Sequence, residues 1–166
     1  MHLSTRGRYA VMAMLDLAKL QAANTNRPIT LAEIAERQDL SLSYLEQLFA
    51  KLRRAKLVKS VRGPGGGYVL ADAPQHTWLH RIVEAVDEDT DVTRCGAGKD
   101  EHGHPKGKGC VHGQLCVTHN LWVALSRHVA TFFQQINLAM VLDGTVQHDF
   151  VLKPSPNSQP ARVRVS

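Results

Sequence analysis

The chain has 166 residues, of which 43% are apolar and only 5% aromatic, and its formal net charge is +5. This composition is sufficient for one globular core, and the scarcity of alternating apolar patterns argues against an all-β fold. No stretch is apolar enough to span a membrane, and Asp16 and Lys19 interrupt the apolar run after Arg6 and Arg8, so we expect a cytoplasmic protein with no signal peptide and no membrane contact.

Three helices are predicted in the first part of the chain. Apolar residues at three- and four-residue steps predict a helix over 4–24, and the capping-box pair Thr30 and Glu33 predicts the start of a second helix. Ser41 or Ser43 begins the third. The residues expected to face inward from the second and third helices are Leu31, Ile34, Ala35, Leu42, Leu45, Leu48, Phe49 and Leu52. Two short helices so close together are typical of a helix-turn-helix.

A β-hairpin and two more helices are predicted after it. The β-prone runs 57–61 and 68–70 flank the glycine-rich segment 62–67, a pattern typical of the wing of a winged helix. A short helix follows over 77–88, with an apolar stripe of Trp78, Ile82, Val83 and Val86. One long helix is predicted over 119–142; its broad apolar face comprises Leu121, Trp122, Leu125, Val129, Phe132, Phe133, Ile136 and Met140 and indicates a partner helix.

We therefore expect a mainly α fold with a small β-wing, that is, a winged helix-turn-helix followed by a long C-terminal dimerisation helix. The expected organisation is a DNA-binding domain over 1–75, a cluster-binding loop and dimerisation helix over 76–143, and a disordered tail over 144–166, which is rich in Pro, Ser and Asn from Pro154 onward.

The positive charge is concentrated in the first half of the chain. Residues 1–75 contain eleven Lys or Arg against six Asp or Glu, whereas the remainder has nine of each. Such a distribution is expected for a phosphate-binding surface, although charge alone fits a solvated basic face equally well. The cations placed to contact phosphates are Lys51, Arg53, Arg54, Lys56 and Lys59.

Four residues early in the third helix are expected to point away from its apolar stripe: Ser43, Tyr44, Glu46 and Gln47. Gln can pair with adenine, Glu can accept a hydrogen bond from cytosine, and Ser can meet either kind of base edge. Arg62 and Gly63 lie at the hairpin tip, where an arginine can enter a minor groove. Taken singly, each feature has another explanation, because Ser43 could be only a cap, Glu46 only a solvated residue, and the glycines only a tight turn.

Residues 95–116 are rich in Gly, Lys and His and cannot pack a core unaided. They contain all three cysteines, an odd number that disfavours a disulfide framework. Cys95, Cys110, Cys116 and the nearby His119 supply donors suited to zinc or to an iron–sulfur cluster. His102, His104 and His112 leave the identity of the fourth ligand open.

The segments GRYA (7–10), SLSYLEQLF (41–49) and VRGPGGGY (61–68) resemble those of the iron–sulfur cluster regulator (IscR) family of winged-helix repressors, and the similarity extends from residue 3 to about residue 142. The resemblance implies base reading by Ser43, Glu46 and Gln47, and minor-groove contact by Arg62. It also implies a 2Fe-2S cluster on the three cysteines and His119. The family's first two cysteines usually lie closer together, whereas fourteen residues intervene here, but a longer flexible loop costs little closure free energy.

The expected function is that of a homodimeric DNA-binding transcription regulator, mainly a repressor of cluster-assembly genes, which senses cluster status. Its expected partners are a pseudo-palindromic double-stranded operator and the cluster-assembly scaffold machinery. Two alternatives remain open: a zinc-stapled DNA-binding protein, and a nitric-oxide- or redox-sensing relative with a different cluster. A third, an enzyme with a reactive cysteine, is weaker. Arg8 argues against the nitric-oxide sensor, where a carboxylate ligand is expected. No nucleophile-base set is recognisable, so we expect no enzyme.

Overall fold

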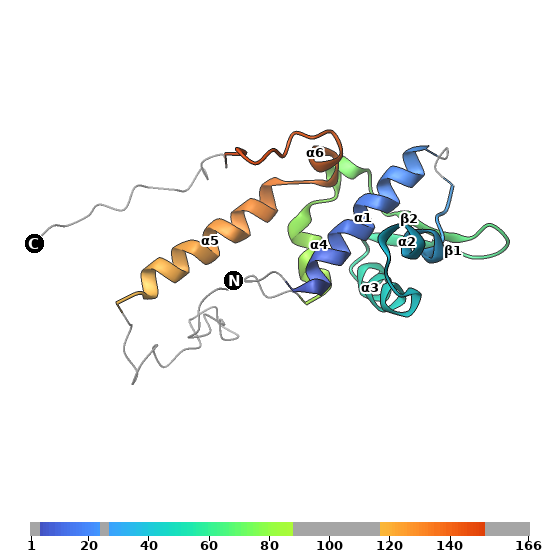
Figure 1. Cartoon of the computed structure of the whole chain (residues 1–166), viewed down its shortest axis with the longest axis horizontal. Coiled ribbons are helices and arrows are strands. Elements are labelled where there is room, and N and C mark those ends of the chain that lie inside the picture. Colours follow the sequence, from blue (N-terminus) through green and yellow to red (C-terminus); the bar gives the residue numbers. More distant parts are fainter. Residues whose placement is uncertain (1–3, 24–26, 88–116, 152–166) are drawn as a thin grey trace, which may run out of the picture.

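The computed structural model of the chain describes residues 4–23, 27–87 and 117–151 (Figure 1). The fold is mainly helical with one two-stranded antiparallel sheet, as expected. None of the helices in these ranges is both long and apolar enough to cross a membrane. The helices and strands follow one another in the order α1 (Thr5–Ala23), α2 (Leu31–Gln38), α3 (Leu42–Arg54), β1 (Val58–Val61), β2 (Gly67–Leu70), the 3-10 turn η1 (Pro74–His76), α4 (Leu79–Ala85), α5 (His119–Gln135) and α6 (Leu138–Leu142).

The helix-turn-helix is formed by α2 and α3, which pack against each other, and α2 also packs against α1. The Thr30 hydroxyl accepts a hydrogen bond from the Glu33 backbone N–H, and the Glu33 carboxylate accepts one from the Thr30 N–H, so the predicted capping box is confirmed. Helix α2 ends at Asp39, whose φ of 51° turns the chain toward α3. The core between these helices is made by Ala10, Met14, Leu17, Ile34, Leu45, Leu48, Phe49 and Leu52.

One ion pair connects α1 to α2 and joins a buried carboxylate to a partly exposed guanidinium. The Asp16 side chain is only 5% exposed, and both of its carboxylate oxygens accept hydrogen bonds from the Arg37 guanidinium at 2.9 to 3.1 Å. A buried carboxylate needs such partners, because removing an ionised group from water is costly. The pair therefore fixes the position of α2 relative to α1.

The predicted hairpin is present and is attached to the helix-turn-helix. Val58 pairs with Leu70 and Val61 with Gly67. The backbone of Tyr68 also exchanges two hydrogen bonds with that of Ile29, just before α2. A Cβ on Gly67 would lie 2.4 Å from the Ile29 carbonyl oxygen, so this close approach requires glycine.

The expectation of one helix over 119–142 is wrong. Ile136 has an extended backbone and is fully buried, and the helix is interrupted there, between α5 and α6. The Ile136 carbonyl accepts a hydrogen bond from Leu79 N–H, and the Thr77 carbonyl accepts one from Leu138 N–H, so backbone pairing across the fold replaces two helical bonds. The Asn137 side chain then caps α6 by accepting from Met140 N–H at 3.0 Å.

Leu42, Trp78 and the bounds of the helix that follows the wing also differ from the sequence expectation. Leu42, expected to face inward, is 45% exposed, because it is the first residue of α3 and lies at the end of the helix rather than over the core. The helix expected over 77–88 spans Leu79–Ala85, and Trp78 is its half-buried N-cap residue rather than part of its stripe. Ile82, Val83 and Val86 are buried as predicted.

Helix α5 extends away from the body of the molecule (Figure 1), and among the described elements it packs against α4. Phe132 and Phe133 contact each other near its C-terminal end, and Phe150 packs against Phe132 at a centroid distance of 6.2 Å. Residues 144–151, which fall in the expected tail, thus belong to the described structure, while 152–166 lie outside it. The expected loop ligands at 95, 110 and 116 also lie outside the described residues.

Candidate nucleic-acid interface

The start of α3 presents polar side chains to solvent. Ser41, not Ser43, is the N-cap, and its hydroxyl accepts a hydrogen bond from the Tyr44 backbone N–H at 3.2 Å. Ser43 is therefore not needed as the cap and is exposed, as are Glu46 and Gln47. A helix N-terminus with outward donors and acceptors is the arrangement by which recognition helices meet phosphates and base edges.

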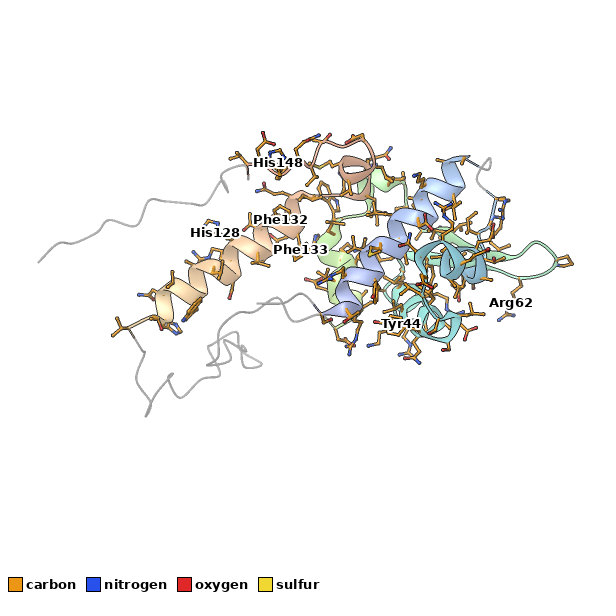
Figure 2. The ribbon with its side chains drawn as sticks, in the orientation of Figure 1. Tyr44, Arg62, His128, Phe132, Phe133 and His148 are labelled. Carbon is orange, nitrogen blue, oxygen red and sulfur yellow. The ribbon has the colours of Figure 1, made fainter. Side chains whose placement is uncertain are left out.

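Tyr44 differs from its neighbours. It is half-buried, packs against the core and contacts Tyr9 edge-on at a centroid distance of 6.0 Å. The sequence expectation that it points away from the apolar stripe misses this contact, because the first turns of α1 pack against this side of α3. Figure 2 marks Tyr44 on α3. The contact between the two rings therefore connects the start of α3 to α1.

Cations gather where α3 meets β1. Arg53, Arg54 and Lys59 are exposed. A cavity of about 350 Å³ is lined by Arg53, Lys56, Val58, Lys59, Ser60 and Ala71. The Lys59 ammonium donates to the Ala71 carbonyl at 3.2 Å. Lys51 behaves differently, since it forms an ion pair with Asp87.

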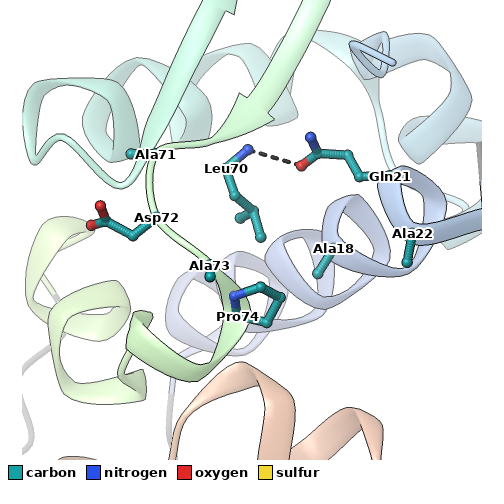
Figure 3. A pocket seen from close by; sticks show the side chains of 8 residues that line it. All are labelled: Ala18, Gln21, Ala22, Leu70, Ala71, Asp72, Ala73 and Pro74. Atoms are coloured by element: carbon teal, nitrogen blue, oxygen red, sulfur yellow. Dashed lines mark hydrogen bonds between the residues drawn. The ribbon is translucent and has the colours of Figure 1, made fainter. Parts of the chain in front are cut away.

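Arg62 and Gly63 are exposed at the start of the turn between β1 and β2, and Figure 2 marks Arg62 on the wing. Gly63 has a φ of +104°, and its carbonyl accepts the Gly66 N–H at 2.9 Å, which closes the turn. Two side chains support the base of the wing. The ring of Phe49 contacts that of Tyr68 at a centroid distance of 5.0 Å. The side-chain Oε1 of Gln21 accepts a hydrogen bond from the Leu70 N–H at 2.9 Å, beside a cavity of about 430 Å³ (Figure 3).

The structure thus brings the expected DNA-contacting residues together on α3, at the junction of α3 with β1 and on the wing. Of the four expected metal ligands it describes His119 alone, as the half-buried first residue of α5. Within residues 4–23, 27–87 and 117–151, no group of three His, Cys, Asp or Glu side chains is arranged to hold a metal ion.

The family model Rrf2, described as an iron-dependent transcriptional regulator, matches residues 3–144. The chain belongs to the Rrf2 family. It is 49% identical over 148 residues to the HTH-type transcriptional regulator IscR of Aliivibrio salmonicida, covering 89% of this chain and 81% of that one. It is 43% identical over 166 residues to IscR of Xenorhabdus nematophila, covering 96% and 94% of the two chains.

Solved structures agree with this assignment. The structure of T. potens IscR matches with a TM-score of 0.65 at 33% identity, covering 92% of this chain and 94% of that one. CymR of B. subtilis, a global cysteine regulator, matches with a TM-score of 0.67 at 28% identity, covering 88% and 99%. This Rrf2-family chain is a DNA-binding transcription regulator with a winged-helix fold, and its relatives are not enzymes, so the predicted class and family are confirmed.

Two ion pairs of the Rrf2-family chain also escaped the sequence analysis. Asp16 and Arg37 lie 21 positions apart, and Lys51 and Asp87 lie 36 apart. Asp16 offers one signal, because a carboxylate within the apolar stripe of a helix requires a buried partner. Asp87 offers no signal of this kind, because it lies in a polar stretch.

Proposed function

We propose that the protein is a cytoplasmic homodimeric regulator, mainly a repressor, of iron–sulfur cluster assembly genes, and that it senses cluster status through a 2Fe-2S cluster on Cys95, Cys110, Cys116 and His119. The observation that carries the proposal is the identity of 49% and 43% to two IscR relatives over most of their lengths, in a chain that contains this donor set.

The donor set fits the cluster chemically. Thiolates and imidazoles are the usual ligands of such clusters, and one neutral imidazole lowers the net negative charge of the site. When bound, a cluster provides a crosslink among its four ligands that depends on iron and sulfide supply. His119 begins α5, so its side chain would connect the cysteine-bearing segment to the helix that bears the exposed apolar face.

The DNA-contacting roles follow the exposed surface of α3 and the wing. Ser43, Glu46 and Gln47 would meet base edges in the major groove, supported by Tyr44. Arg62 would enter the minor groove, with Gly63 allowing close approach of the backbone. The phosphate contacts would come from Arg53, Arg54 and Lys59.

A second copy of the chain is the partner that the α5 face would bury. Leu121 is 60% exposed, Trp122 42% and Leu125 38%. Large apolar side chains exposed together on one helix mark an interaction surface. Two-fold pairing along α5 would present two recognition helices to a pseudo-palindromic operator.

Anaerobic purification tests the cluster. We expect brown protein with two iron and two sulfide per subunit, and loss of both when Cys95, Cys110 and Cys116 are all replaced by Ser. A zinc-stapled protein would be colourless and contain zinc, and a redox- or nitric-oxide-sensing relative with another cluster would show a different ratio of iron to protein. Equal operator affinity of cluster-loaded and cluster-free protein on every site would contradict the sensing role.

The salt dependence of binding tests the basic surface. Removal of one cation that binds a phosphate should reduce the slope of log affinity against log salt by about 0.9. We expect this reduction for Arg54→Gln, and no change for Arg127→Gln, which removes one exposed cation from α5 and serves as the matched control. Fluorescence anisotropy with a labelled duplex measures both, and a flat salt response of the unaltered protein would contradict DNA binding through this surface.

A further inference from the structure

Lys51 continues the row of side chains expected to face DNA. Ser43, Gln47 and Lys51 follow one another at four-residue steps on α3, so they lie along one side of the helix. The Lys51 ammonium, however, lies 2.6 Å from a carboxylate oxygen of Asp87, which follows α4. A cation in the row is therefore paired with an anion of the same chain.

Asp87 is held in place by its backbone. It adopts a φ of 55°, and its N–H donates to the Glu84 carbonyl at 3.0 Å. Arg6 donates to the carbonyl of Val86, the preceding residue, at 3.3 Å, which connects this turn to α1. The hydrogen bond from Lys51 lowers the pKa of Asp87, followed by the charges of Lys51 and Arg6, so the carboxylate is ionised at neutral pH. Figure 1 shows the first turn of α1 next to the end of α4, and α4 also packs against α3.

The ion pair is accessible to a competing anion. The Asp87 side chain is 74% exposed and that of Lys51 33% exposed. Ion pairs in such positions contribute little stability, because water and salt screen them. A DNA phosphate, which carries a full charge in a dense array, can therefore replace the carboxylate at small cost.

We propose that Asp87 competes with the DNA backbone for Lys51 and thereby lowers the affinity of the regulator for DNA of any sequence. Asp87 is a positioning residue in this role, since it acts through Lys51 and touches no base. The inference rests on the proposed function as a DNA-binding regulator. It adds a residue outside the recognition helix and the wing that sets how strongly the protein binds the backbone.

The test is a double-mutant cycle on the full chain. Affinity for a labelled mixed-sequence duplex of roughly 30 base pairs, long enough for two half-sites, is measured by fluorescence anisotropy between about 50 and 200 mM salt. Asp87→Asn should bind about two- to fivefold more tightly at the lower salt. The slope against salt should steepen by about 0.9, because one more phosphate contact releases a counterion. In a Lys51→Gln background the gain should disappear.

Two further variants distinguish the loss of the Lys51–Asp87 ion pair from a change in the net charge of the protein. Asp72→Asn removes one exposed carboxylate elsewhere, and its effect should be the same with Lys51 or Gln at position 51. Asp87→Gly removes the carboxylate while tolerating the positive φ, and it should reproduce the gain of Asp87→Asn.

Unchanged affinity and slope in both Asp87 variants, or the same gain in the Lys51→Gln background, would overturn the inference. If the unaltered protein failed to bind the duplex in a salt-dependent way, the proposed function itself would be overturned, and the two failures are thus distinct.

Discussion

The ion pair of Asp16 with Arg37 holds α2 of the helix-turn-helix against α1. The carboxylate is almost completely buried, whereas the guanidinium reaches solvent. Arg37→Met would remove the cation that pairs with the buried Asp16 carboxylate. We expect a decrease in Tm of about 5 to 10 °C. Arg27→Met, which breaks the exposed pair with Glu33, is the control and should lower Tm by less than about 3 °C. Thermal unfolding followed by circular dichroism measures both, and equal decreases would contradict the argument.

Glu33 provides a pH-dependent contribution. Hydrogen bonds from Arg27, and then from the Thr30 backbone, lower the pKa of Glu33 from 4.5 to about 2. Because the folded pKa lies below the unfolded one, the stabilisation is present above pH 4.5 and is lost as pH falls toward about 2.

Glu33→Gln should therefore reduce the free energy of unfolding near neutral pH by about 0.5 kcal/mol, a small value because solvent screens a side chain that is one-third exposed. The difference from the unaltered protein should vanish as pH falls toward about 2. Urea denaturation at a series of pH values checks this, with Glu36→Gln on the same helix as the control. A difference that stays constant with pH would contradict the assignment.

At the scale of elements, the wing depends on its contact with the segment before α2. Gly67→Ala would place a Cβ against the Ile29 carbonyl and disturb the Ile29–Tyr68 pairing. We expect a decrease of about 2 kcal/mol in the free energy of unfolding, together with weaker DNA binding. Gly65→Ala has open space around it and only a φ of +74°, so its cost should be about 1 kcal/mol. Urea denaturation and anisotropy distinguish them, and similar decreases would mean that the close approach is unimportant.

At the scale of the whole molecule, we expect the exposed apolar face of α5 to decide the state of assembly. Leu121→Glu introduces a charge into the exposed apolar face and should convert a dimer into a monomer, while the fold of each chain is retained because Leu121 is 60% exposed. Gln134→Glu adds the same charge on the opposite side of α5 and should leave the dimer intact. Light scattering coupled to size exclusion gives the masses. A dimer that survives Leu121→Glu would place the interface elsewhere.

Local patterns were sufficient for much of this protein. The capping box at Thr30 and Glu33 and the glycine-rich turn over 62–67 are each decided by residues a few positions apart, which is why the sequence alone predicted them. The exposure of Ser43, Glu46 and Gln47 follows from helical periodicity in the same way. The donor set of three cysteines and His119 is also a sequence prediction, and its cluster is a proposal.

Only the tertiary structure decided the remainder. The break at Ile136 and Asn137 depends on backbone pairing with the segment around Trp78, and the Asn137 side chain donates to the carbonyl of Gln75, 62 positions earlier. Helical periodicity continues through this point in the sequence and gives no sign of the break. The pairing of Lys51 with Asp87 is likewise set by where α4 ends against α3. Such contacts depend on how distant segments pack, and a pattern of neighbouring residues carries no information about that packing.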